Sequence, residues 1–413
     1  MDTGKWGKWE GAARMWPVVL TFVPVDQRIT SPRSTSIDLL RGVVMVIMAL
    51  DHVRDYFHAD AFLFGPTDLE ATSVPLFLTR WITHFCAPVF VFLAGTSAWF
   101  IHQRKDTRAL SLFLLKRGLW LIAVECILVT FGWLFNPTYP IFGLQVIWAI
   151  GISMLALAAM VHLPLRWIAL IGAVLVFGHN ALDNVHFENV WWYFLHERGR
   201  ADWLGHTAVF AYPVIPWIGT MALGYAFGTL YGKAYTPEVR QRLLFRLGLS
   251  VTLLFIALRV VNDYGDPSPW TVQRSASFSL LSFLNLTKYP PSLLYLLMTL
   301  GPAILFLALT EKAKGWFASA LIVIGRVPFF YYILHIYLIH ALAMLAAQLT
   351  GFGWQSMVLD KPVWFSESLK GYGFSLPVVY LVWIGVVLAL YPLCVWFNKV
   401  KSNNRQIWWL SYL

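Results

Sequence analysis

Residues 36–57 read SIDLLRGVVMVIMALDHVRDYF, a largely apolar run that is long enough to cross a bilayer as one helix. Two ionisable side chains stand out within it, Arg41 and His52, eleven positions apart. Eleven helical steps of ~100° return the chain to within ~20° of the same face, ~16 Å further along the axis. An ionisable residue inside a membrane is costly and is by default a functional hypothesis. We therefore predict one helix face that carries a cation near one membrane surface and an imidazole toward the other.

The composition places most of the chain in a membrane. Of its 413 residues, 58% are hydrophobic and 13% are charged, with a mean hydropathy of +0.63, whereas soluble domains carry about 25% charged residues. The net charge of +10 is typical of basic cytoplasmic loops and does not call for a nucleic-acid partner. Cys86, Cys126 and Cys394 all lie in apolar stretches, so no disulfide framework is expected.

Apolar runs of ~20 residues predict an all-α bundle of about ten transmembrane helices. The runs are residues 37–57, 76–101, 112–134, 144–162, 166–179, 207–231, 244–263, 289–310, 318–347 and 375–398. The ninth run is long, and its GRVP sequence at 325–328 predicts a kink or the point where the helix enters the membrane. Lysine and arginine concentrate in alternate connections, which predicts that those connections and both termini are cytoplasmic.

Three regions are predicted along the chain: an interfacial arm at 1–33, the transmembrane domain at 34–398 and a cytoplasmic tail at 399–413. The arm has three basic residues before a short apolar stretch at 15–25. No small-residue cleavage site follows that stretch, so we interpret the segment as a cytoplasmic arm with its tryptophans at the interface, not as a signal peptide.

The first span holds most of the candidate chemistry. A guanidinium is always charged and can form two parallel hydrogen bonds with a phosphate. Arg41, near the cytoplasmic surface, is therefore a candidate to bind an anionic cofactor that arrives from the cytosol. Asp38 lies three residues before Arg41 and is expected to pair with it on one helical face.

His52 is the candidate general base, because a neutral imidazole can take a proton from a hydroxyl or an amine. Asp51 and Asp55 would orient its ring or tune its pKa. His58, six residues later at the helix end, is either functional or a solvated interfacial residue.

Polar side chains in other spans are candidates for the wall of an acceptor pocket. His84 and His335 either line a cavity or make hydrogen bonds between helices. Proline-rich backbone at membrane depth is tolerated where it is buried or lines a cavity, and 211–217 (AYPVIPW) is such a stretch. The expected pocket residues are Gln145, Trp148, Tyr212, Trp217 and His335.

Several familiar motifs do not occur in the sequence. It has no phosphate-binding P-loop, no HExxH and no closely spaced His/Cys set. We therefore predict no bound metal, although three histidines on separate helices would be a minimal zinc set.

These segments resemble two related families of membrane enzymes. Residues 36–42 (SIDLLRG) followed by His52 resemble the Arg-x10-His signature of the acyltransferase-three family, which acylates cell-envelope sugars. The ordered series SIDLLRG, APVFVFLAG, YPVIPWIG and RVPFFYYILHIYLIH is more similar to the catalytic domain of heparan-α-glucosaminide N-acetyltransferase and its bacterial relatives. The resemblance covers roughly residues 34–398.

The resemblance implies an acyltransferase that uses cytosolic acetyl-CoA, or another acyl-CoA, and an amino or hydroxyl group of a sugar on the far side of the bilayer. Arg41 and His52 carry over from the Arg-x10-His signature, and Lys116 and Arg117 would assist Arg41 with the donor phosphates. The lysosomal enzyme has asparagine at the position of His52 and its catalytic histidine slightly downstream. The catalytic assignment is thus divided between His52 and His58, with His52 preferred.

The sequence leaves alternatives for the mechanism, the function and the oligomeric state. Direct transfer and a covalent acyl-histidine intermediate are both compatible with the residues. A proton-coupled secondary transporter that uses His52, His84, Asp51 and Asp55 is the alternative function, although no inverted repeat is visible. The lack of a sorting segment and the bacterial resemblance favour a bacterial inner membrane, with a homodimer among the options for its oligomeric state.

Overall fold

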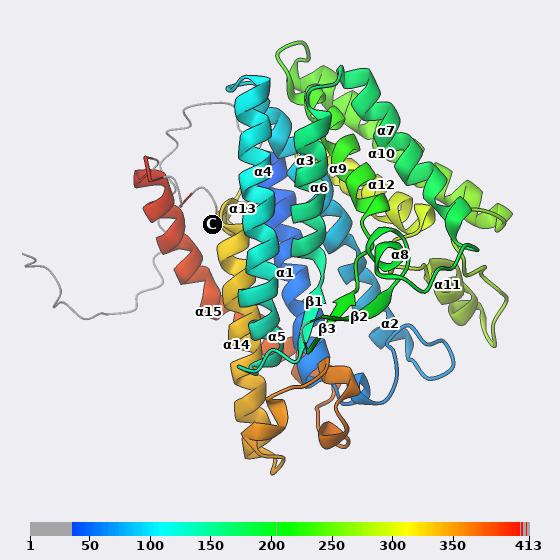
Figure 1. Ribbon diagram of the computed structural model, residues 1–413, viewed down its shortest axis with the longest axis vertical. Coiled ribbons are helices and arrows are strands. Elements are labelled where there is room, and N and C mark those ends of the chain that lie inside the picture. The colour runs from blue at the N-terminus through cyan, green and yellow to red at the C-terminus, as the bar shows by residue number, and fades with distance from the viewer. Residues whose placement is uncertain (1–34, 204, 405, 408–409, 411–413) are drawn as a thin grey trace, which may run out of the picture. The chain divides into compact units, whose positions relative to one another are not determined.

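The computed structural model describes residues 35–203, 205–404, 406–407 and 410. The predicted arm at 1–33 lies outside these residues, and the tail at 399–413 is described only in part. The described chain is predominantly helical (Figure 1). Its α-helices are α1 Thr35–Phe57, α2 Val74–Ile82, α3 Cys86–His102, α4 Thr107–Val124, α5 Thr130–Leu134, α6 Val146–Met160, α7 Leu165–Gly178, α8 Val190–Leu195, α9 Ile215–Phe227, α10 Pro237–Val261, α11 Ala276–Leu284, α12 Leu293–Leu309, α13 Trp316–Arg326, α14 Pro328–Leu349 and α15 Leu376–Asn403.

Five helical stretches are long and apolar enough to cross a membrane by length and composition. They are Val74–His102, Leu165–Leu182, Pro237–Val261, Pro328–Leu349 and Leu376–Asn403. The outward faces of these helices expose large aliphatic side chains, such as Val261 on α10 and Leu381 on α15. Such continuous apolar exposure is typical of a surface covered by lipid, not by water. The total of ten spans and the side on which the termini lie stay predictions.

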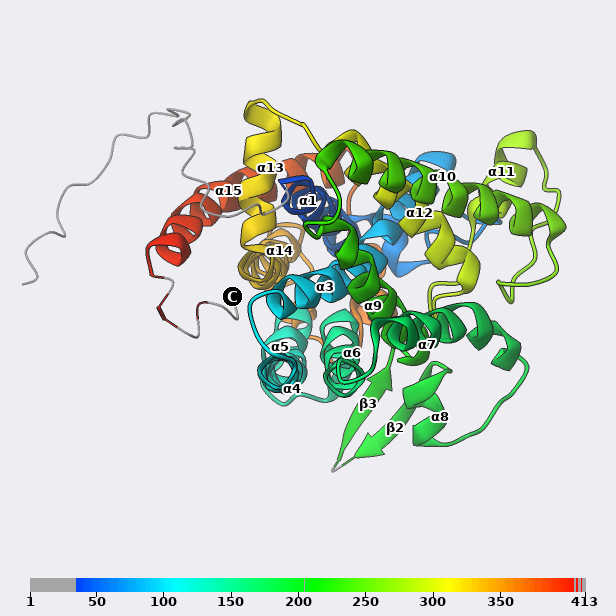
Figure 2. The same ribbon diagram turned by 90° about the horizontal axis from the view of Figure 1, so that it is seen from above.

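Helix α1 lies at the centre of the bundle. It packs against α3, α13, α14 and α15, and Figure 2 shows these helices arranged around it. Even its charged residues Asp38, Asp51 and Arg54 are buried. The segment that holds the candidate residues is therefore the core of the protein, and its polar groups face other helices.

The ninth apolar run contains two helices. As predicted from GRVP, the chain breaks there: α13 ends at Arg326 and α14 begins at Pro328. Proline at the start of a helix is favoured because its missing N–H has no partner in that first turn. The break lets α13 pack along α1 while α14 contacts the other end of α1.

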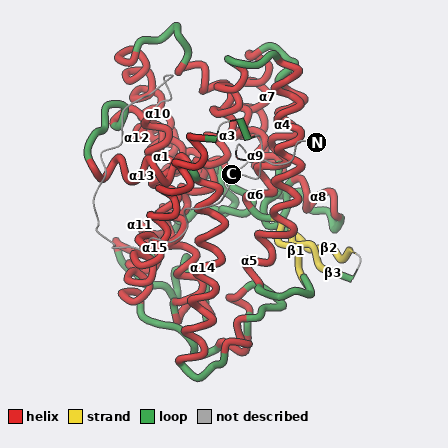
Figure 3. The backbone as a smooth tube through the Cα atoms, turned by 90° about the vertical axis from the view of Figure 1, so that its left-hand side faces the viewer, coloured by secondary structure: helices red, strands yellow, loops and turns green. Residues whose placement is uncertain are grey.

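The all-helical prediction misses a small sheet, and it begins the sixth span too early. Strands β1 (Ile141–Leu144), β2 (Gly199–Trp203) and β3 (His206–Phe210) form a sheet in the order β1-β3-β2, with β1 parallel and β2 antiparallel to β3 (Figure 3). The helix of the predicted span 207–231 starts only at Ile215, with a proline in its first turn. Residues 206–210 satisfy their backbone groups on two neighbouring strands instead of within a helix.

Helices α1 and α13 cross at two glycines. A Cβ added to Gly42 would lie 1.9 Å from the carbonyl oxygen of Leu321, and one added to Gly325 would lie 1.8 Å from the carbonyl oxygen of Asp38. Each helix thus lets the backbone of the other approach where any larger residue would collide. The glycine in SIDLLRG is therefore explained by packing.

We expect Gly42→Ala to destabilise the protein by at least about 1–3 kcal/mol, because the obstacle is backbone and cannot rotate away. Gly385→Ala is the matched control. It lies in α15 with nothing within 4 Å of an added Cβ, so it should be neutral or stabilising by about 0.5–1 kcal/mol. Thermal unfolding midpoints of the two variants in detergent check this, and equal midpoints would contradict the crossing.

Candidate active site

His52 forms a pair with a histidine from a distant helix. Its Nδ1 lies 2.7 Å from Nε2 of His335 on α14, and the two rings are stacked with centroids 4.9 Å apart. His335 is fully buried, and its own Nδ1 lies 3.0 Å from the carbonyl oxygen of Tyr331. A continuous chain of hydrogen bonds therefore runs from a backbone carbonyl through His335 to His52.

This chain determines which nitrogen of His52 is basic. A carbonyl oxygen can only accept, so Nδ1 of His335 must carry its proton, and Nε2 of a neutral His335 must then be an acceptor. His52 consequently donates from Nδ1, which leaves a lone pair on its Nε2. The arrangement is that of an oriented base, in which a second group holds the imidazole in one tautomer.

Aromatic side chains complete the surroundings of His52. The ring of Trp133, in α5, meets the His52 ring edge-on at a centroid distance of 4.8 Å. Tyr56, one helical turn after His52, stacks on Trp133 and donates to its carbonyl oxygen at 2.6 Å. His52 itself is only half-buried, so its ring is confined but reachable.

Asp51 takes part in a network of buried ion pairs. Its carboxylate accepts from Arg80 of α2, and its Oδ1 lies 3.0 Å from Nη2 of Arg54, which also pairs with Asp55. Within the described chain, the hydrogen-bond partner of the His52 ring is His335. The orienting role that we predicted for Asp51 and Asp55 is thus filled by a residue on another helix.

His58 is engaged at the end of α1. It precedes a short 3₁₀ turn, Ala59–Phe62, and its Nδ1 accepts from the backbone N–H of Asp60 at 3.2 Å. Burial lowers the pKa of this imidazole, and the nearby Asp60 carboxylate only partly offsets the effect. Because its Nδ1 lone pair is already used as a helix cap, the geometry favours His52 over His58 as the base.

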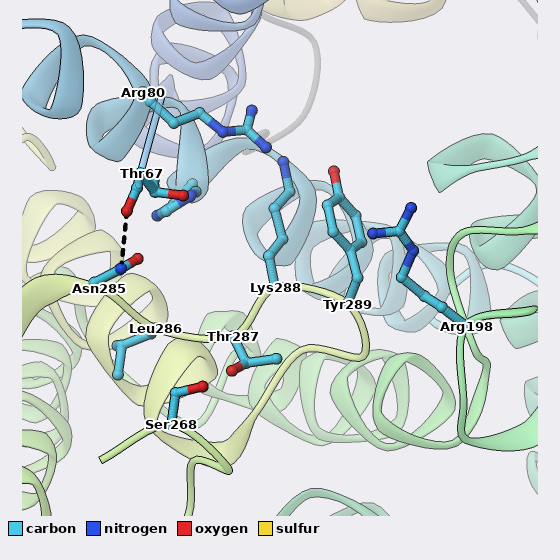
Figure 4. A pocket seen from close by; sticks show the side chains of 10 residues that line it. Thr67, Arg80, Arg198, Ser268, Asn285, Leu286, Thr287, Lys288 and Tyr289 are labelled. Carbon is cyan, nitrogen blue, oxygen red and sulfur yellow. Dashed lines mark hydrogen bonds between the residues drawn. The ribbon is translucent and has the colours of Figure 1, made fainter. Parts of the chain in front are cut away.

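Beside this pair lies a cavity of about 300 Å³ that is lined by cations (Figure 4). The ten lining residues include Arg80, Arg198 and Lys288 and no carboxylate. Figure 4 shows the side chains of Lys288 and Arg198 on either side of the Tyr289 ring, with Arg80 ending toward the tip of Lys288. The Arg198 guanidinium lies 5.2 Å and the Lys288 Nζ 5.1 Å from the centre of that ring.

Tyr289, in the loop before α12, reports the positive potential of this cavity. Burial acts to raise the pKa of its phenol, but the cations of Lys288 and Arg80 outweigh burial and lower that pKa to about 8. Arg80 lines the cavity and donates to Asp51, the residue directly before His52. The cavity therefore lies next to the part of α1 that carries the histidine pair.

A buried arginine and a half-buried aspartate shape the loop that carries Lys288. Arg259 of α10 is 1% exposed and donates to four carbonyl oxygens, those of Ser268, Ser282, Phe283 and Asn285, at 2.9–3.1 Å. The carboxylate of Asp266 accepts from the N–H and hydroxyl of Thr287 and from the hydroxyl of Ser292. The cavity floor is thus held in place before any ligand arrives.

We expect Arg259→Met to loosen this loop, because each buried acceptor left unsatisfied costs about 1–3 kcal/mol. Four acceptors share the guanidinium, so the local cost should reach at least about 3 kcal/mol. Hydrogen exchange of residues 268–292 should accelerate markedly. Arg246→Met is the control, since Arg246 is an exposed arginine of the same helix. Unchanged exchange in the Arg259 variant would show that the guanidinium does not hold the loop.

The predicted donor-site residues lie in two places. Arg41 is 13% exposed and donates to Asp38 at 3.2 Å, to the hydroxyl of Ser97 and to the carbonyl oxygen of Leu93. Asp38 also pairs with Arg326 at 3.5 Å, so the expected Asp38–Arg41 pair is present with a second guanidinium. Separately, Lys116 is exposed and Arg117 half-buried on α4.

The predicted pocket residues also divide into two groups. The ring of Tyr212 meets that of Tyr289 edge-on, with centroids 5.2 Å apart, and its centroid lies 5.4 Å from that of the fully buried Trp217. His84 lines the cavity. Gln145 and Trp148, in contrast, form the start of α6, where the N–H of Trp148 donates to Glu125 at 3.0 Å.

Sequence reasoning missed several residues that the structure brings into the site. One of them is Arg80, which lies inside a predicted span, where an intramembrane charge would have been a sufficient signal. Arg198 and Lys288 lie in connections between predicted spans, where a charged side chain is ordinary. Nothing local in the sequence indicates that these two loops meet at one cavity.

The bundle and its site define a helical membrane protein with an oriented imidazole base beside a cationic cavity. Heparan-alpha-glucosaminide N-acetyltransferase, catalytic, is the family that matches residues 33–258, which is more than half of the chain. The chain belongs to this family of membrane acetyltransferases. No match was found among curated proteins.

The match begins just before α1 and ends within α10, so it includes His52, Arg80 and Arg198. His335, Lys288 and Tyr289 lie beyond it. The family supports the transferase interpretation and gives no support to the alternative of a secondary transporter.

Proposed function

We propose that the protein transfers an acyl group, with acetyl as the first candidate, from cytosolic acyl-CoA to an amino or hydroxyl group of an extracytoplasmic sugar or glycan. The observation that carries this proposal is the Tyr331–His335–His52 chain, because it leaves a lone pair on Nε2 of His52 at a half-buried position. The family supplies the reaction class, and the geometry supplies the base.

In the proposed reaction, Nε2 of His52 takes the proton of the acceptor amine or hydroxyl as its nitrogen or oxygen attacks the thioester carbonyl. A C–N or C–O bond forms, the C–S bond breaks, and the electron pair of that bond leaves on sulfur. His52 then returns the proton to the departing thiolate. His335 keeps the imidazolium oriented throughout by accepting from Nδ1.

On the donor side, we propose that the phosphates of acyl-CoA bind near Arg41 and Asp38, with help from Lys116 and Arg117 in the middle of α4. Two guanidinium groups, those of Arg41 and Arg326, surround the single carboxylate of Asp38. A guanidinium can form paired hydrogen bonds with a phosphate, so this cluster of arginines supports binding of an anionic donor. The acceptor would enter from the opposite end of α1, where the cavity lies beside Asp51 and His52.

The test uses purified protein in detergent with acetyl-CoA labelled in its acetyl group. We expect binding, slow thioester cleavage without acceptor, and faster cleavage with an amino sugar. Arg41→Ala should weaken acetyl-CoA binding, and His58→Ala should retain cleavage. Absence of acetyl-CoA binding by the wild type, together with absence of binding of longer acyl-CoA, would overturn the proposal.

A further inference from the structure

We propose that the cavity formed by Arg80, Arg198 and Lys288 binds an anionic group of the acceptor, a carboxylate or a phosphate. This inference deepens the proposed function and rests on it for the identity of the ligand as an acceptor. It would make negative charge on the sugar the main determinant of acceptor selectivity.

The first observation that supports anion binding is the charge of the residues that line the cavity. Arg80 is balanced by Asp51, with which it forms an ion pair. Lys288 and Arg198 project into the same space, and the residues that line this space include no acid. Two cations around one cavity, without a lining carboxylate, form an arrangement that an anion would complete.

A buried histidine provides a second, independent observation. His84 lines the cavity and is 2% exposed, and its Nδ1 has no hydrogen-bond partner among the residues that the structure describes. A buried polar atom without a partner is costly, so the wall of the cavity contains a polar group that packing alone does not satisfy. His84 therefore extends the recognition surface from the anionic group toward the remainder of the acceptor.

Hydrogen bonds within the protein also hold the walls of the cavity in place. Arg259 and Asp266 hold the loop that carries Lys288 through the hydrogen bonds given above. Asn285, on the same loop, donates to the carbonyl oxygen of Thr67 at 3.1 Å, which closes one side (Figure 4). A volume of about 300 Å³ lies at the lower end of the range for small-molecule pockets, which suits one sugar unit with a charged substituent.

The position of the cavity links anion binding to the reaction. Arg80 lines the cavity and donates to Asp51, the residue directly before His52. An acceptor anchored by its anion between Lys288 and Arg198 would thus have its amine or hydroxyl on the side of the base. Anchoring of this kind lowers the entropy cost of bringing the nucleophile to the thioester.

The test compares three amino sugars with the same amine: muramic acid with a carboxylate, glucosamine 6-phosphate with a phosphate, and methyl glucosaminide with neither. Wild type, Lys288→Met, Arg198→Met and the control Arg200→Met are assayed with acetyl-CoA for kcat and KM. Binding of each sugar without acetyl-CoA is measured by calorimetry. Lys288→Arg, which keeps the charge, checks that loss of binding does not come from misfolding.

In the wild type, we expect one of the charged sugars to have a KM at least roughly 10-fold below that of methyl glucosaminide. Lys288→Met or Arg198→Met should raise the KM for that charged sugar roughly 10-fold. The same variants should change the KM for methyl glucosaminide less than about twofold, and Arg200→Met should resemble wild type. The carboxylate and phosphate arms identify which anion the cavity takes.

Equal KM values for charged and neutral sugars in the wild type, or equal losses for both in the variants, would overturn the proposal while transfer itself stands. If neither acetyl-CoA nor a longer acyl-CoA binds, but calorimetry shows Lys288-dependent binding of a charged sugar, the proposed function fails and the anion site stands.

Discussion

His52→Ala is expected to lower kcat for acetyl transfer by at least about 100-fold, and up to about 10⁴-fold, while acetyl-CoA binding is retained. The size follows from the usual contribution of a positioned general base. The ring is half-buried beside Trp133, so its removal leaves a small space and should not unfold the bundle. The measurements are single-turnover transfer and acetyl-CoA binding on the same preparations.

His58→Ala is the matched control, since it removes an imidazole from the end of the same helix. Its Nδ1 caps a short turn, so we expect a lower thermal midpoint, by an amount typical of a lost cap of about 1 kcal/mol, with kcat within a few-fold of wild type. A large loss of kcat at His58 with full activity at His52 would transfer the catalytic role to His58.

The second large effect is expected at His335, which we interpret as a positioning residue. His335→Leu removes the acceptor for Nδ1–H of His52, so the imidazole is no longer held in one tautomer and orientation. Loss of such a partner typically lowers activity roughly 10- to 100-fold. The loss should appear in kcat, with the KM values for donor and acceptor little changed, because His335 touches neither ligand in the proposed reaction.

The conservative variant His335→Gln separates positioning from simple packing. A glutamine side chain can place its amide oxygen where Nε2 of His335 lies and accept from His52. We therefore expect His335→Gln to recover most of the activity that His335→Leu loses. If leucine and glutamine lower kcat equally, or if both lower only the thermal midpoint, the hydrogen-bond chain has no role in catalysis.

The locations of the helices could largely be predicted from apolar run length, because the bilayer requires long apolar segments whose backbone groups are satisfied internally. The break at 325–328 could also be predicted from the sequence, since proline cannot continue the hydrogen-bonding of a preceding helix. The sheet around β3 could not be predicted in this way, because its strand pairing joins residues 141–144 with the distant residues 207–210. In addition, a short apolar stretch has the same pattern whether it forms a strand or the start of a helix.

For the site, the local pattern indicated that Arg41 and His52 share a helix that carries chemistry, and it indicated the Asp38–Arg41 pair. Periodicity shows which face of a helix is polar, but it does not show which helix will pack on that face. His52 meets His335, which lies 283 positions away, only because α1 and α14 pack together, and this contact decides which nitrogen is basic.

The cationic cavity also exists only because distant segments pack together. Its residues come from α2, from the chain before β2 and from the loop before α12, and none of these segments has a charge pattern that predicts the others. Membrane residence, the positions of most helices and a helix that carries an imidazole follow from the order of residue types alone. The partner that orients His52 and the cationic cavity follow from contacts between distant segments, which depend on how the helices pack.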